Sequence, residues 1–498
     1  MEYFLILDVG TTNVKACAFS GGKLLESAEE KLTPLHPQPG WAELDPMQVV
    51  RAVFRVSDAI VSKLGTPKAL GITNQRSSTA VWYRETGEPL CNIITWQDTR
   101  TIQLVREYSR KGLVALGRCV GRAAEALSTI VRPLKFTRRG AYLITLAHAS
   151  FGTTHSSMHL RWIMDNVEGA RSALERGAAV FGTMDSWVAW NLTGEHVTDY
   201  TNASATGLFD PYAMRWSATL LKLLEIPQQC LPRIVTNDTP IGRVSHLNAP
   251  LLTIIADQQA SLYVAGVRKG AAKITCGTGA FIDVNVGARP PPAARGIYPM
   301  VALTTRKNAL YLLEGFVTTA GSAIEWLLRI GVLKDYSELD EAATKGRSGV
   351  IFVPALEGLG TPFMKPDARA VLANLSSDTT REDLIRGVLE GIAACCSLAM
   401  NHLQRASHVE IPEVFADGGL TQSNVFLQLL ADFSARKIVR THYSNNSAYG
   451  AYMLCERIIR GEDPIEHWTP PGISRIFEPR GGGVLPARLT SLLKRTMS

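Results

Sequence analysis

The sequence predicts an α/β protein made of two domains with a similar plan, and three observations support this prediction. The chain has 498 residues, which is more than one hydrophobic core usually supports. Each half begins with an apolar strand, a turn rich in Gly and Thr, and a second strand, at residues 3–19 and 271–286. Each half then continues with alternating strand-like and helix-like segments. This duplication predicts two α/β domains with a cleft between them.

In the first half, apolar runs and turn residues define the expected elements. An antiparallel meander is expected from strands at residues 3–7, 14–19 and 23–31, with turns at residues 10–12 and 21–22. Apolar residues with helical periodicity predict a helix over residues 47–64. The remaining expected elements are strands at 69–74, 80–83, 93–96 and 178–181, and helical segments within 101–149 and at 159–166, 170–176, 186–192 and 216–224.

In the second half, a segment rich in Asn, Asp, Thr and Pro at residues 237–242 marks the expected domain boundary, which we place after residue 246. The N-cap spacing of Thr380 and Asp383 before an apolar face predicts the clearest helix, at residues 380–402. The other expected elements are strands at 251–256, 271–274, 281–286, 300–303, 309–313, 350–354 and 414–416, helices at 321–330, 423–434 and 447–459, and a basic amphipathic tail at 481–498.

Composition and charge exclude several classes of function. Hydrophobic residues make up 46% and charged residues 19% of the chain, as in ordinary globular proteins. The net charge of +7 is spread along the chain, without a block of Lys and Arg interleaved with aromatic residues. Nucleic-acid binding is therefore not favoured, and the basic excess suits a small anionic substrate such as a nucleotide.

The cysteines and the apolar segments point to the cytoplasm. The 8 cysteines are scattered and form no C-x-x-C motif, so neither a disulfide framework nor a zinc site is expected. The first residues, MEYFLILDVG, lack the basic start of a signal peptide. The apolar segment 309–332 is interrupted by Glu314 and Glu325, so we expect no membrane span.

Asp257 and the turn at residues 275–279 together suggest a chemistry. Asp257 is a lone carboxylate at the end of an expected strand. The turn reads Thr-Cys-Gly-Thr-Gly, and its backbone N–H groups and hydroxyls can hold phosphate oxygens because glycine permits a close approach. A carboxylate base beside a phosphate cradle is what phosphoryl transfer to an alcohol requires. Taken alone, the turn has a simpler interpretation as an ordinary hairpin, and Asp257 as the cap of the following helix. The second Gly/Thr turn at residues 10–12 instead favours a cleft that binds a nucleoside triphosphate.

A series of motifs resembles the FGGY carbohydrate kinases, and among them the glycerol kinases most closely. The first half contains LDVGTT at residues 7–12, GITNQR at 71–76, VWYRETGEPL at 81–90, WQDTRT at 96–101, FGTMDSW at 181–187 and TDYTNAS at 198–204. The second half contains ADQQASL at 256–262, LEGF at 313–316, GLGTP at 358–362 and DGG at 417–419. The motifs follow the order of the family and cover nearly the whole chain.

The resemblance implies two actin-like (RNase H-like) domains with ATP in the cleft between them. Residues 1–246 would carry the polyol side and the first phosphate hairpin, and residues 247–498 the catalytic Asp, the second hairpin and the adenosine site. Asp257 matches the general base, and Asp8 matches a carboxylate that organises Mg²⁺ through water. The matching substrate residues are Arg76, Ser77, Trp96, Asp257, Gln258 and Phe281. The matching ATP residues are Thr11, Thr12, Asn13, Thr275, Gly277, Thr278, Gly321, Glu325, Gly418, Gly419, and the pair Ser423 and Asn424, either of which can correspond to the family's Asn.

The polyol site departs from the pattern of the glycerol kinases. Ser77 stands where these kinases carry a Glu, and the segment before Trp162 has Thr154 and His155 where a Tyr is expected. That segment is also longer than the family pattern, with an insertion at about residues 115–158 whose basic run at residues 132–139 we interpret as a solvated face. Loss of a charged acceptor at position 77 is compatible with weaker glycerol binding, with a replacement contact from His155 or His159, or with another substrate.

The sequence therefore predicts a kinase that uses ATP and Mg²⁺ to phosphorylate a terminal hydroxyl of a small polyol, with glycerol converted to sn-glycerol 3-phosphate as the first hypothesis. A ketopentose such as xylulose or ribulose is the alternative substrate, which Ser77 leaves open. A nucleotide-driven clamp without kinase activity is a third hypothesis, because actin-like folds also serve other proteins. The expected partners are the polyol and ATP, without nucleic acid or membrane, and possible homo-oligomers.

Overall fold

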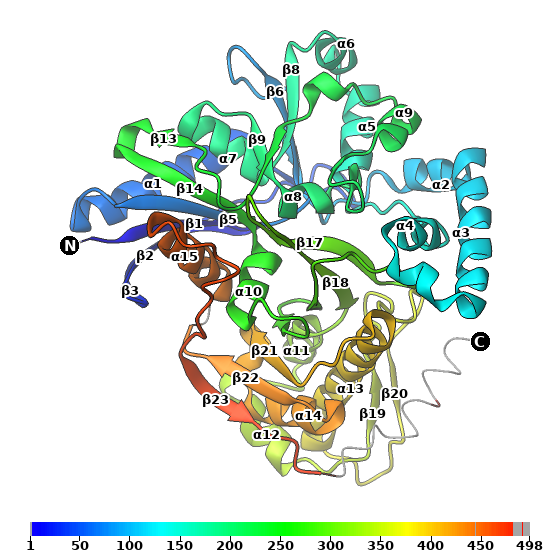
Figure 1. Cartoon of the computed structure of the whole chain (residues 1–498). Coiled ribbons are helices and arrows are strands. Elements are labelled where there is room, and N and C mark those ends of the chain that lie inside the picture. The colour runs from blue at the N-terminus through cyan, green and yellow to red at the C-terminus, as the bar shows by residue number, and fades with distance from the viewer. Residues whose placement is uncertain (1, 444, 482–490, 492–498) are drawn as a thin grey trace. The chain divides into compact units, whose positions relative to one another are not determined.

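The computed structural model describes residues 2–443, 445–481 and 491, which form two compact units (Figure 1). The first unit contains the described residues up to Val264 together with Met300–Tyr311 and Ser447–Trp468, and the second unit contains the rest. The first unit thus continues past residue 246, where the sequence analysis placed the boundary, because strand β14 (Ala249–Ala256) pairs with β5 (Ala69–Asn74) of the first unit.

The main sheet of unit 1 has the strand order β13-β14-β5-β1-β2-β3. The expected antiparallel meander consists of β1 (Phe4–Val9), β2 (Asn13–Ser20) and β3 (Lys23–Lys31). Both β5 and β14 run parallel to β1, and β13 (Gly242–Val244) is antiparallel to β14. The register aligns Val9, Asn74 and Ala256 across the three parallel strands, so the residues that follow them emerge at one edge of the sheet.

Helix α1 (Pro46–Leu64) covers this sheet and begins where the sequence provides a cap. The carboxylate of Asp45 accepts a hydrogen bond from the backbone N–H of Met47 at 2.8 Å, and Pro46 occupies the first turn. The helix packs on β2 and β3 with a buried apolar face that includes Val49, Val53 and Ile60. A smaller antiparallel sheet has the order β4 (Glu43–Leu44), β7 (Ile93–Ile94), β6 (Thr79–Tyr83) and β8 (Ala179–Thr183).

The expected insertion forms a group of helices at the side of unit 1 (Figure 1). The insertion, expected at about residues 115–158, comprises most of α3 (Gly112–Ile130), the short 3₁₀ helix η1 (Arg132–Phe136) and α4 (Arg138–Leu146), and α2 (Ile102–Arg110) precedes it. In its basic run, Arg132 and Arg139 are exposed. The other elements of unit 1 are α5 (Ser156–Asn166), α6 (Ala170–Glu175), α7 (Met184–Thr193), β9 (Val197–Asp199), α8 (Tyr200–Ala205), β10 (Phe209–Asp210), β11 (Arg215–Trp216), α9 (Ala218–Leu224), β12 (Arg233–Val235) and α10 (Asp257–Ala265), whose last residue belongs to unit 2.

Helix α15 (Asn446–Ile459) comes from the second half of the sequence but packs in unit 1. Gly450 lies so close to α10 that an added Cβ would be 2.0 Å from the carbonyl oxygen of Ala260. Cys455 likewise lies against Gly71 of β5. This close packing explains why residues 447–468 belong to the first unit.

The sheet of unit 2 repeats the plan of unit 1. Its order is β17-β18-β16-β15-β21-β22-β23, with an antiparallel hairpin of β15 (Ala272–Cys276) and β16 (Ala280–Gly287). As in unit 1, two parallel strands follow the hairpin, β21 (Glu413–Asp417) and β22 (Lys437–Thr441), and an antiparallel edge strand ends the series, β23 (Ile473–Phe477). The duplication inferred from the sequence is therefore present in the fold, and the chain passes between the units through β17 (Tyr298–Thr304) and β18 (Ala309–Val317).

The longest helix of unit 2 is α13 (Arg381–Ser407), and it begins as the sequence predicts. Thr380 and Asp383 form a reciprocal capping box, and Ile385, Val388 and Ile392 lie on its buried face. The other elements are α11 (Gly321–Arg329), α12 (Leu339–Lys345), β19 (Ile351–Val353), β20 (Val371–Ala373) and α14 (Asn424–Ser434), with the short 3₁₀ helices η4 (Tyr336–Glu338) and η5 (Gly419–Gln422).

The structure contains several short strands that the sequence analysis missed, among them β9, β12 and β23. Strands of three to five residues carry little periodic signal, because the partner strand decides their existence. The expected amphipathic tail lies outside the described residues apart from residues 481 and 491. Among the described residues, no helix combines the length and the apolar character that crossing a membrane requires.

Candidate active site

Asp257 lies at the edge of the unit 1 sheet where β1, β5 and β14 end. The register that aligns Val9, Asn74 and Ala256 brings Gly10, Gln75 and Asp257 out side by side. Asp257 is also the first residue of α10. A sheet edge of this kind, at the carboxyl ends of parallel strands, is the usual location of a ligand site in α/β folds.

Buried polar side chains hold the end of β14 in place behind Asp257. The hydroxyl of Thr201 accepts a hydrogen bond from the backbone N–H of Ala256 at 2.9 Å. The next residue, Asn202, exchanges hydrogen bonds of 3.0 and 3.2 Å with Asn74 of β5 and donates to the Asp199 carboxylate at 2.8 Å. These groups are fully buried, so their bonds fix the backbone on both sides of the site.

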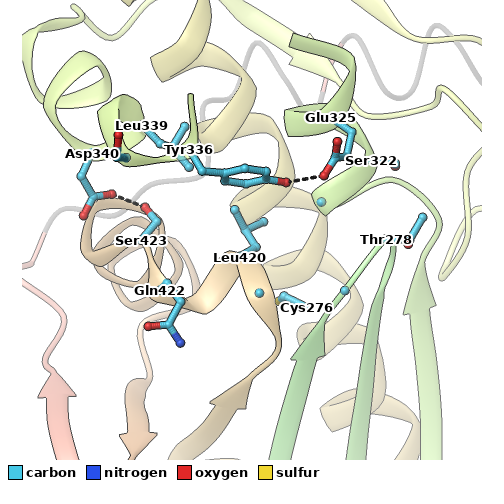
Figure 2. A pocket seen from close by; sticks show the side chains of 14 residues that line it. Cys276, Thr278, Ser322, Glu325, Tyr336, Leu339, Asp340, Leu420, Gln422 and Ser423 are labelled. Atoms are coloured by element: carbon cyan, nitrogen blue, oxygen red, sulfur yellow. Dashed lines mark hydrogen bonds between the residues drawn. The ribbon is translucent and has the colours of Figure 1, made fainter. Parts of the chain in front are cut away.

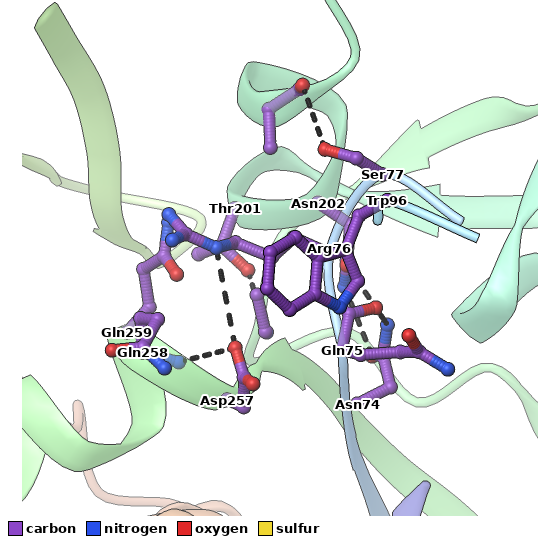
Figure 3. A network of polar contacts seen from close by, with 12 residues as sticks. Asn74, Gln75, Arg76, Ser77, Trp96, Thr201, Asn202, Asp257, Gln258 and Gln259 are labelled. Carbon is purple, nitrogen blue, oxygen red and sulfur yellow. Dashed lines mark hydrogen bonds and ion pairs between the residues drawn. The ribbon is translucent and has the colours of Figure 1, made fainter. Parts of the chain in front are cut away.

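Arg76 and Asp257 are turned toward each other (Figure 3). The guanidinium Nε lies 4.0 Å from Asp257 Oδ1, and both side chains are partly buried. The same carboxylate oxygen accepts the backbone N–H of Gln258 at 2.7 Å, and Arg76 Nη1 contacts the sulfur of Met300 at 3.5 Å. A planar cation and a carboxylate at this distance can both contact a small hydroxylated ligand.

A chain of hydrogen bonds links the first Gly/Thr turn to Trp96. The indole Nε1–H of Trp96 donates to the hydroxyl of Thr11 at 3.1 Å, and this hydroxyl donates to Gln75 Oε1 at 2.8 Å. Gln75 Nε2 donates in turn to the carbonyl of Gly10 at 3.0 Å, and the Ser78 hydroxyl donates to Gln75 Oε1 at 2.9 Å. The structure thus brings Thr11, Arg76, Trp96 and Asp257 to one edge of unit 1.

Ser77 is directed away from this pair. Its hydroxyl donates to the carbonyl oxygen of Ala205 at 3.1 Å, and its φ of 66° is in the left-handed region. Its own carbonyl accepts the hydroxyl of Ser156 at 2.9 Å. The serine is therefore tied to α8 and to the start of α5.

The histidines of the longer segment are structural groups. His159 donates from Nε2 to the carbonyl of Thr153 at 2.7 Å, and its Nδ1 accepts the hydroxyl of Thr79 at 3.2 Å. His155 Nδ1 accepts the backbone N–H of Gly152 at 3.3 Å. Burial lowers the pKa of both imidazoles to about 4, so both are neutral at pH 7.

Three further residues of the expected ATP and metal set lie on the β1–β2 hairpin. Thr12 is exposed, and Asn13 donates to Glu29 of β3. Asp8 is on β1 opposite Lys15. No group of three or more His, Cys, Asp or Glu side chains in the described part of the chain could hold a metal ion. A single carboxylate suits Mg²⁺, which keeps several waters and takes other ligands from substrate phosphates, so Asp8 fits a magnesium ion that a nucleotide helps to hold.

Unit 2 contains a cavity of about 600 Å³ next to the second Gly/Thr turn. Figure 2 shows the cavity with its lining side chains. The residues that line it come from the β15–β16 turn, from α11, η4 and α12, and from η5: Cys276, Gly277, Thr278, Gly321, Ser322, Glu325, Tyr336, Ser337, Leu339, Asp340, Gly419, Leu420, Gln422 and Ser423. The volume is in the range of sites for cofactors and other small molecules.

Two glycines allow the elements around the cavity to approach the turn. A Cβ on Gly321, the first residue of α11, would lie 2.5 Å from the carbonyl oxygen of Gly277. A Cβ on Gly418, which has a φ of 92°, would lie 2.5 Å from the carbonyl oxygen of Cys276. The backbone N–H of Ser322 donates to Thr278 O at 3.0 Å. The N-terminus of α11 therefore packs directly against the turn, and the N–H groups of Gly321 and Ser322 donate to its carbonyls.

Hydrogen bonds shape the other end of the cavity (Figure 2). The Tyr336 hydroxyl donates to Glu325 Oε1 at 2.9 Å, and burial together with this carboxylate raises the pKa of Tyr336 to about 12. The Asp340 carboxylate accepts the hydroxyl of Ser423 and the backbone N–H of Asn424 at 2.8 Å. The Oδ1 atom of Asn424 is buried without a hydrogen-bond partner. Polar and apolar groups together therefore line the cavity, as a nucleoside requires.

The expected site residues are thus divided between the units. Asp8, Thr11, Thr12, Asn13, Arg76, Ser77, Trp96, Asp257 and Gln258 belong to unit 1, whereas Thr275, Gly277, Thr278, Phe281, Gly321, Glu325, Gly418, Gly419, Ser423 and Asn424 belong to unit 2. The sequence analysis missed the contacts of Gln75 and Thr201, although both lie in motifs that it identified. It also missed Tyr336 and Asp340, whose segment carries no motif.

Two family models cover most of the chain. The N-terminal domain model of the FGGY family of carbohydrate kinases matches residues 3–116 and 114–256, and the C-terminal domain model matches residues 272–457. The chain is 32% identical over 476 residues to a sugar kinase of Archaeoglobus fulgidus, with 95% of each chain covered. It is 34% identical over 463 residues to glycerol kinase 5 of Danio rerio, with 90% of this chain and 86% of that protein covered.

A solved structure agrees with these matches. The glycerol kinase of Plasmodium falciparum, determined with ADP, superposes with a TM-score of 0.86 at 27% identity and covers 100% of this chain and 99% of that chain. Xylulose kinase structures, such as that from Lactobacillus acidophilus, superpose with a TM-score of 0.81 at 19% identity, which shows a shared fold. The actin-like fold expected from the sequence is therefore confirmed.

Proposed function

The chain belongs to the FGGY family of carbohydrate kinases, and from this membership we propose that it transfers the γ-phosphoryl group of ATP to a terminal hydroxyl of glycerol, releasing ADP and sn-glycerol 3-phosphate. The observation that supports this proposal most is the pair Arg76 and Asp257, 4.0 Å apart at the edge of the unit 1 sheet. Several relatives at 32–34% identity over most of the chain are glycerol kinases, which makes glycerol the first substrate to test.

In this proposal, the unit 1 site binds the polyol. The guanidinium of Arg76 donates to two neighbouring hydroxyls, for which its planar fork is suited. Trp96 covers the carbon chain, and Gln258 contributes a polar contact. The hydrogen bond from Trp96 to Thr11 fixes the indole. The same contact therefore fixes the position of Trp96 relative to the first Gly/Thr turn.

Asp257 acts as the general base. Its carboxylate accepts the proton of the attacking hydroxyl while the hydroxyl oxygen forms a bond to the γ-phosphorus. The bond from the γ-phosphorus to the bridging oxygen breaks, and ADP leaves with that electron pair. The N–H of Gln258 donates to the carboxylate, and the bond from the Ala256 N–H to Thr201 fixes the backbone before it, so the base needs little rearrangement during the transfer.

The nucleotide occupies the cavity of unit 2, with the base and ribose among Tyr336, Leu420 and the Asp340–Ser423 pair. Thr275, Gly277 and Thr278 of the turn in unit 2 bind phosphate oxygens through hydroxyl and N–H groups. The turn of unit 1, with Thr11, Thr12 and Asn13, offers the same kinds of group to a phosphate. Asp8 would hold Mg²⁺ through water, and that ion would neutralise phosphate charge when bound.

We further propose that the enzyme acts in the cytoplasm. All eight cysteines are free, and six of them are buried. Free thiols are typical of proteins in a reducing compartment.

A coupled ADP-release assay tests the substrate. MgATP is supplied with glycerol, dihydroxyacetone, xylulose, ribulose, erythritol or no second substrate, and glycerol is expected to stimulate ADP release most. The product is then identified as sn-glycerol 3-phosphate with a stereospecific dehydrogenase. ADP release that no polyol stimulates would contradict the kinase proposal and favour the nucleotide-driven clamp.

A ketopentose is the second candidate because of Ser77. The position lacks the carboxylate that glycerol kinases carry there, and its hydroxyl is bonded to Ala205. Stimulation by xylulose or ribulose alone, with glycerol inactive, would replace glycerol by a ketopentose and leave the roles of Asp257 and Arg76 unchanged.

A further inference from the structure

The outer face of α3 carries an exposed apolar stripe with a heptad repeat. Leu113, Val120 and Leu127 are seven residues apart, and Leu116, Ala123 and Ile130 form a second series three residues after them. The five large side chains are 43–83% exposed, and Ala123 is exposed as well. This spacing is the a and d pattern with which one helix packs on another.

The opposite face of α3 is fixed to the rest of the insertion. A Cβ on Gly121 would lie 2.0 Å from the backbone nitrogen of Ala147, so the helix packs closely on the segment after α4. Arg118 donates to the carbonyls of Ala149 at 2.9 Å and Ser109 at 3.0 Å, and Glu125 contacts His148 at 3.2 Å. These contacts orient α3 so that the stripe faces away from the rest of the insertion. In Figure 1, α3 lies at the side of unit 1.

The residues that flank the stripe carry no charge. The e and g positions within α3 are Gly112, Gly117, Cys119, Ala124 and Ala126, whereas the charged residues Arg118, Arg122 and Glu125 occupy the c and f positions away from the stripe. Small uncharged flanks allow a second helix to approach closely and do not repel a copy of themselves. The N-terminal family model matches the chain in two segments, 3–116 and 114–256, which meet within the first part of this helix.

The stripe is complementary to itself under a two-fold rotation. Leu113 and Ile130, Leu116 and Leu127, and Val120 and Ala123 are pairs whose members are equally far from the centre of the stripe. Two antiparallel copies of α3 would therefore place each residue opposite its pair member in the other copy. With the exposed Val131 and Phe136 beside it, the stripe presents on the order of 800 Å² per chain, the size that a stable dimer buries on each side.

We propose that α3 is the dimer interface of this enzyme and that it pairs with α3 of a second copy in antiparallel orientation. The exposed stripe, its uncharged flanks and its two-fold symmetry all fit this partner. A lipid surface fits less well, because amphipathic helices that bind lipids carry Lys and Arg beside the apolar face, and α3 does not.

Sedimentation velocity and light scattering of the full chain test this proposal. The wild type is expected at twice the mass of one chain. Leu116→Glu or Leu127→Lys alone should give monomers, because each places two charges in the apolar seam. The double variant with both substitutions should regain the dimer, since antiparallel pairing sets each Glu against a Lys. Ala115→Glu, one residue off the stripe and exposed, is the matched control and should remain dimeric.

Three outcomes would overturn the proposal. A monomeric wild type at all concentrations would exclude the interface, and its sedimentation with phosphatidylserine vesicles would identify a lipid surface as the occupant. Dimers that survive both single substitutions would place the interface elsewhere. A double variant that stays monomeric would exclude the antiparallel register, because parallel pairing sets Glu against Glu and Lys against Lys.

Cys119 provides an independent readout. It is the only one of the eight cysteines that is exposed, and in the antiparallel pair it lies near the two-fold axis. A short bismaleimide is expected to join two wild-type chains covalently and to leave the Leu116→Glu variant unjoined. Equal cross-linking of both proteins would contradict the proposed pairing.

Discussion

At the scale of single residues, the candidate base depends on neighbours that no ligand would touch. Thr201 binds the N–H of Ala256, and Asn202 joins Asn74 to Asp199. Each of these bonds is buried, and breaking one would leave an unsatisfied polar group beside the site. The position of the Asp257 carboxylate is therefore determined by packing in three different elements, β14, α8 and β5.

Replacing Asp257 by Asn tests its role as the base. The substitution keeps the shape but removes the proton acceptor, so kcat should fall by about 10²–10⁴-fold. ADP binding, measured by calorimetry, should stay within about threefold, because the cavity of unit 2 is unchanged. The melting temperature of the Asp257→Asn variant itself, expected to stay near that of the wild type, controls for loss of fold. A kcat within tenfold of the wild type would remove Asp257 from this role.

The buried His159 should make stability depend on pH. Its pKa is lowered to about 4 in the folded chain by burial, against 6.5 in the unfolded chain. The unfolded state therefore binds more protons below pH 6.5, and stability is complete above that pH and is lost as the pH falls toward 4. In urea unfolding between pH 7 and 4.5, the free energy of unfolding of the His159→Gln variant should fall less steeply with decreasing pH, by up to ~1.4 kcal/mol per pH unit. The exposed His36→Gln is the control, and equal slopes in both variants would contradict the expectation.

At the scale of elements, the second Gly/Thr turn is supported from inside the sheet. Lys273 and Asp283, on the paired strands β15 and β16, form a fully buried ion pair of 2.9 Å. Lys273 Nζ also donates to the hydroxyl of Thr275 at 3.0 Å. The lysine thus connects the strand core to the first residue of the turn and limits its movement.

Thr278→Val tests the phosphate role of that turn. The valine has the same shape but lacks the hydroxyl that lines the cavity. A lost bond to a charged phosphate costs about 1.5–3 kcal/mol, so the KM for ATP should rise by roughly 10–100-fold. The KM for the polyol should change little, because the polyol residues Arg76 and Trp96 belong to unit 1. Initial rates with each substrate varied in turn measure both constants, and a larger effect on the polyol would mean that the turn binds something else.

At the scale of the whole molecule, the proposed function places the nucleoside in unit 2 and the polyol in unit 1. The residues around the cavity all belong to unit 2, and Arg76, Trp96 and Asp257 all belong to unit 1. Ligand binding stabilises the backbone that it contacts. The units should therefore respond to different ligands when each is added alone.

Hydrogen exchange with ADP or glycerol tests this assignment. ADP alone should slow exchange in the β15–β16 turn and at the start of α11, and glycerol alone should slow it around Arg76 and at the start of α10. An Asp340→Asn variant, which weakens the bonds to Ser423 and Asn424, should lose much of the ADP effect and keep the glycerol effect. Protection by ADP confined to unit 1 would show that the cavity is not the nucleotide site.

Local sequence signals were sufficient to predict the duplicated α/β plan, most helices and the family. These features depend on local signals, such as the capping box at Thr380, the Gly/Thr turns and the order of the motifs. The sequence also indicated Asp257, since a carboxylate at the end of a strand beside a Gly/Thr turn is visible in a single chain segment.

Which residues meet in the site depends on packing between distant segments and could not be predicted from the sequence. The alignment of Gly10, Gln75 and Asp257 follows from the register of three strands far apart in the sequence, and register depends on packing between them. The same is true of Tyr336 and Asp340 at the cavity and of Ser77, whose hydroxyl donates to the carbonyl of Ala205 in α8. The sequence predicted a helical segment here, but it did not show which face of α3 is exposed. The structure shows that the apolar stripe faces outward, because Gly121 makes its close contact on another side of the helix.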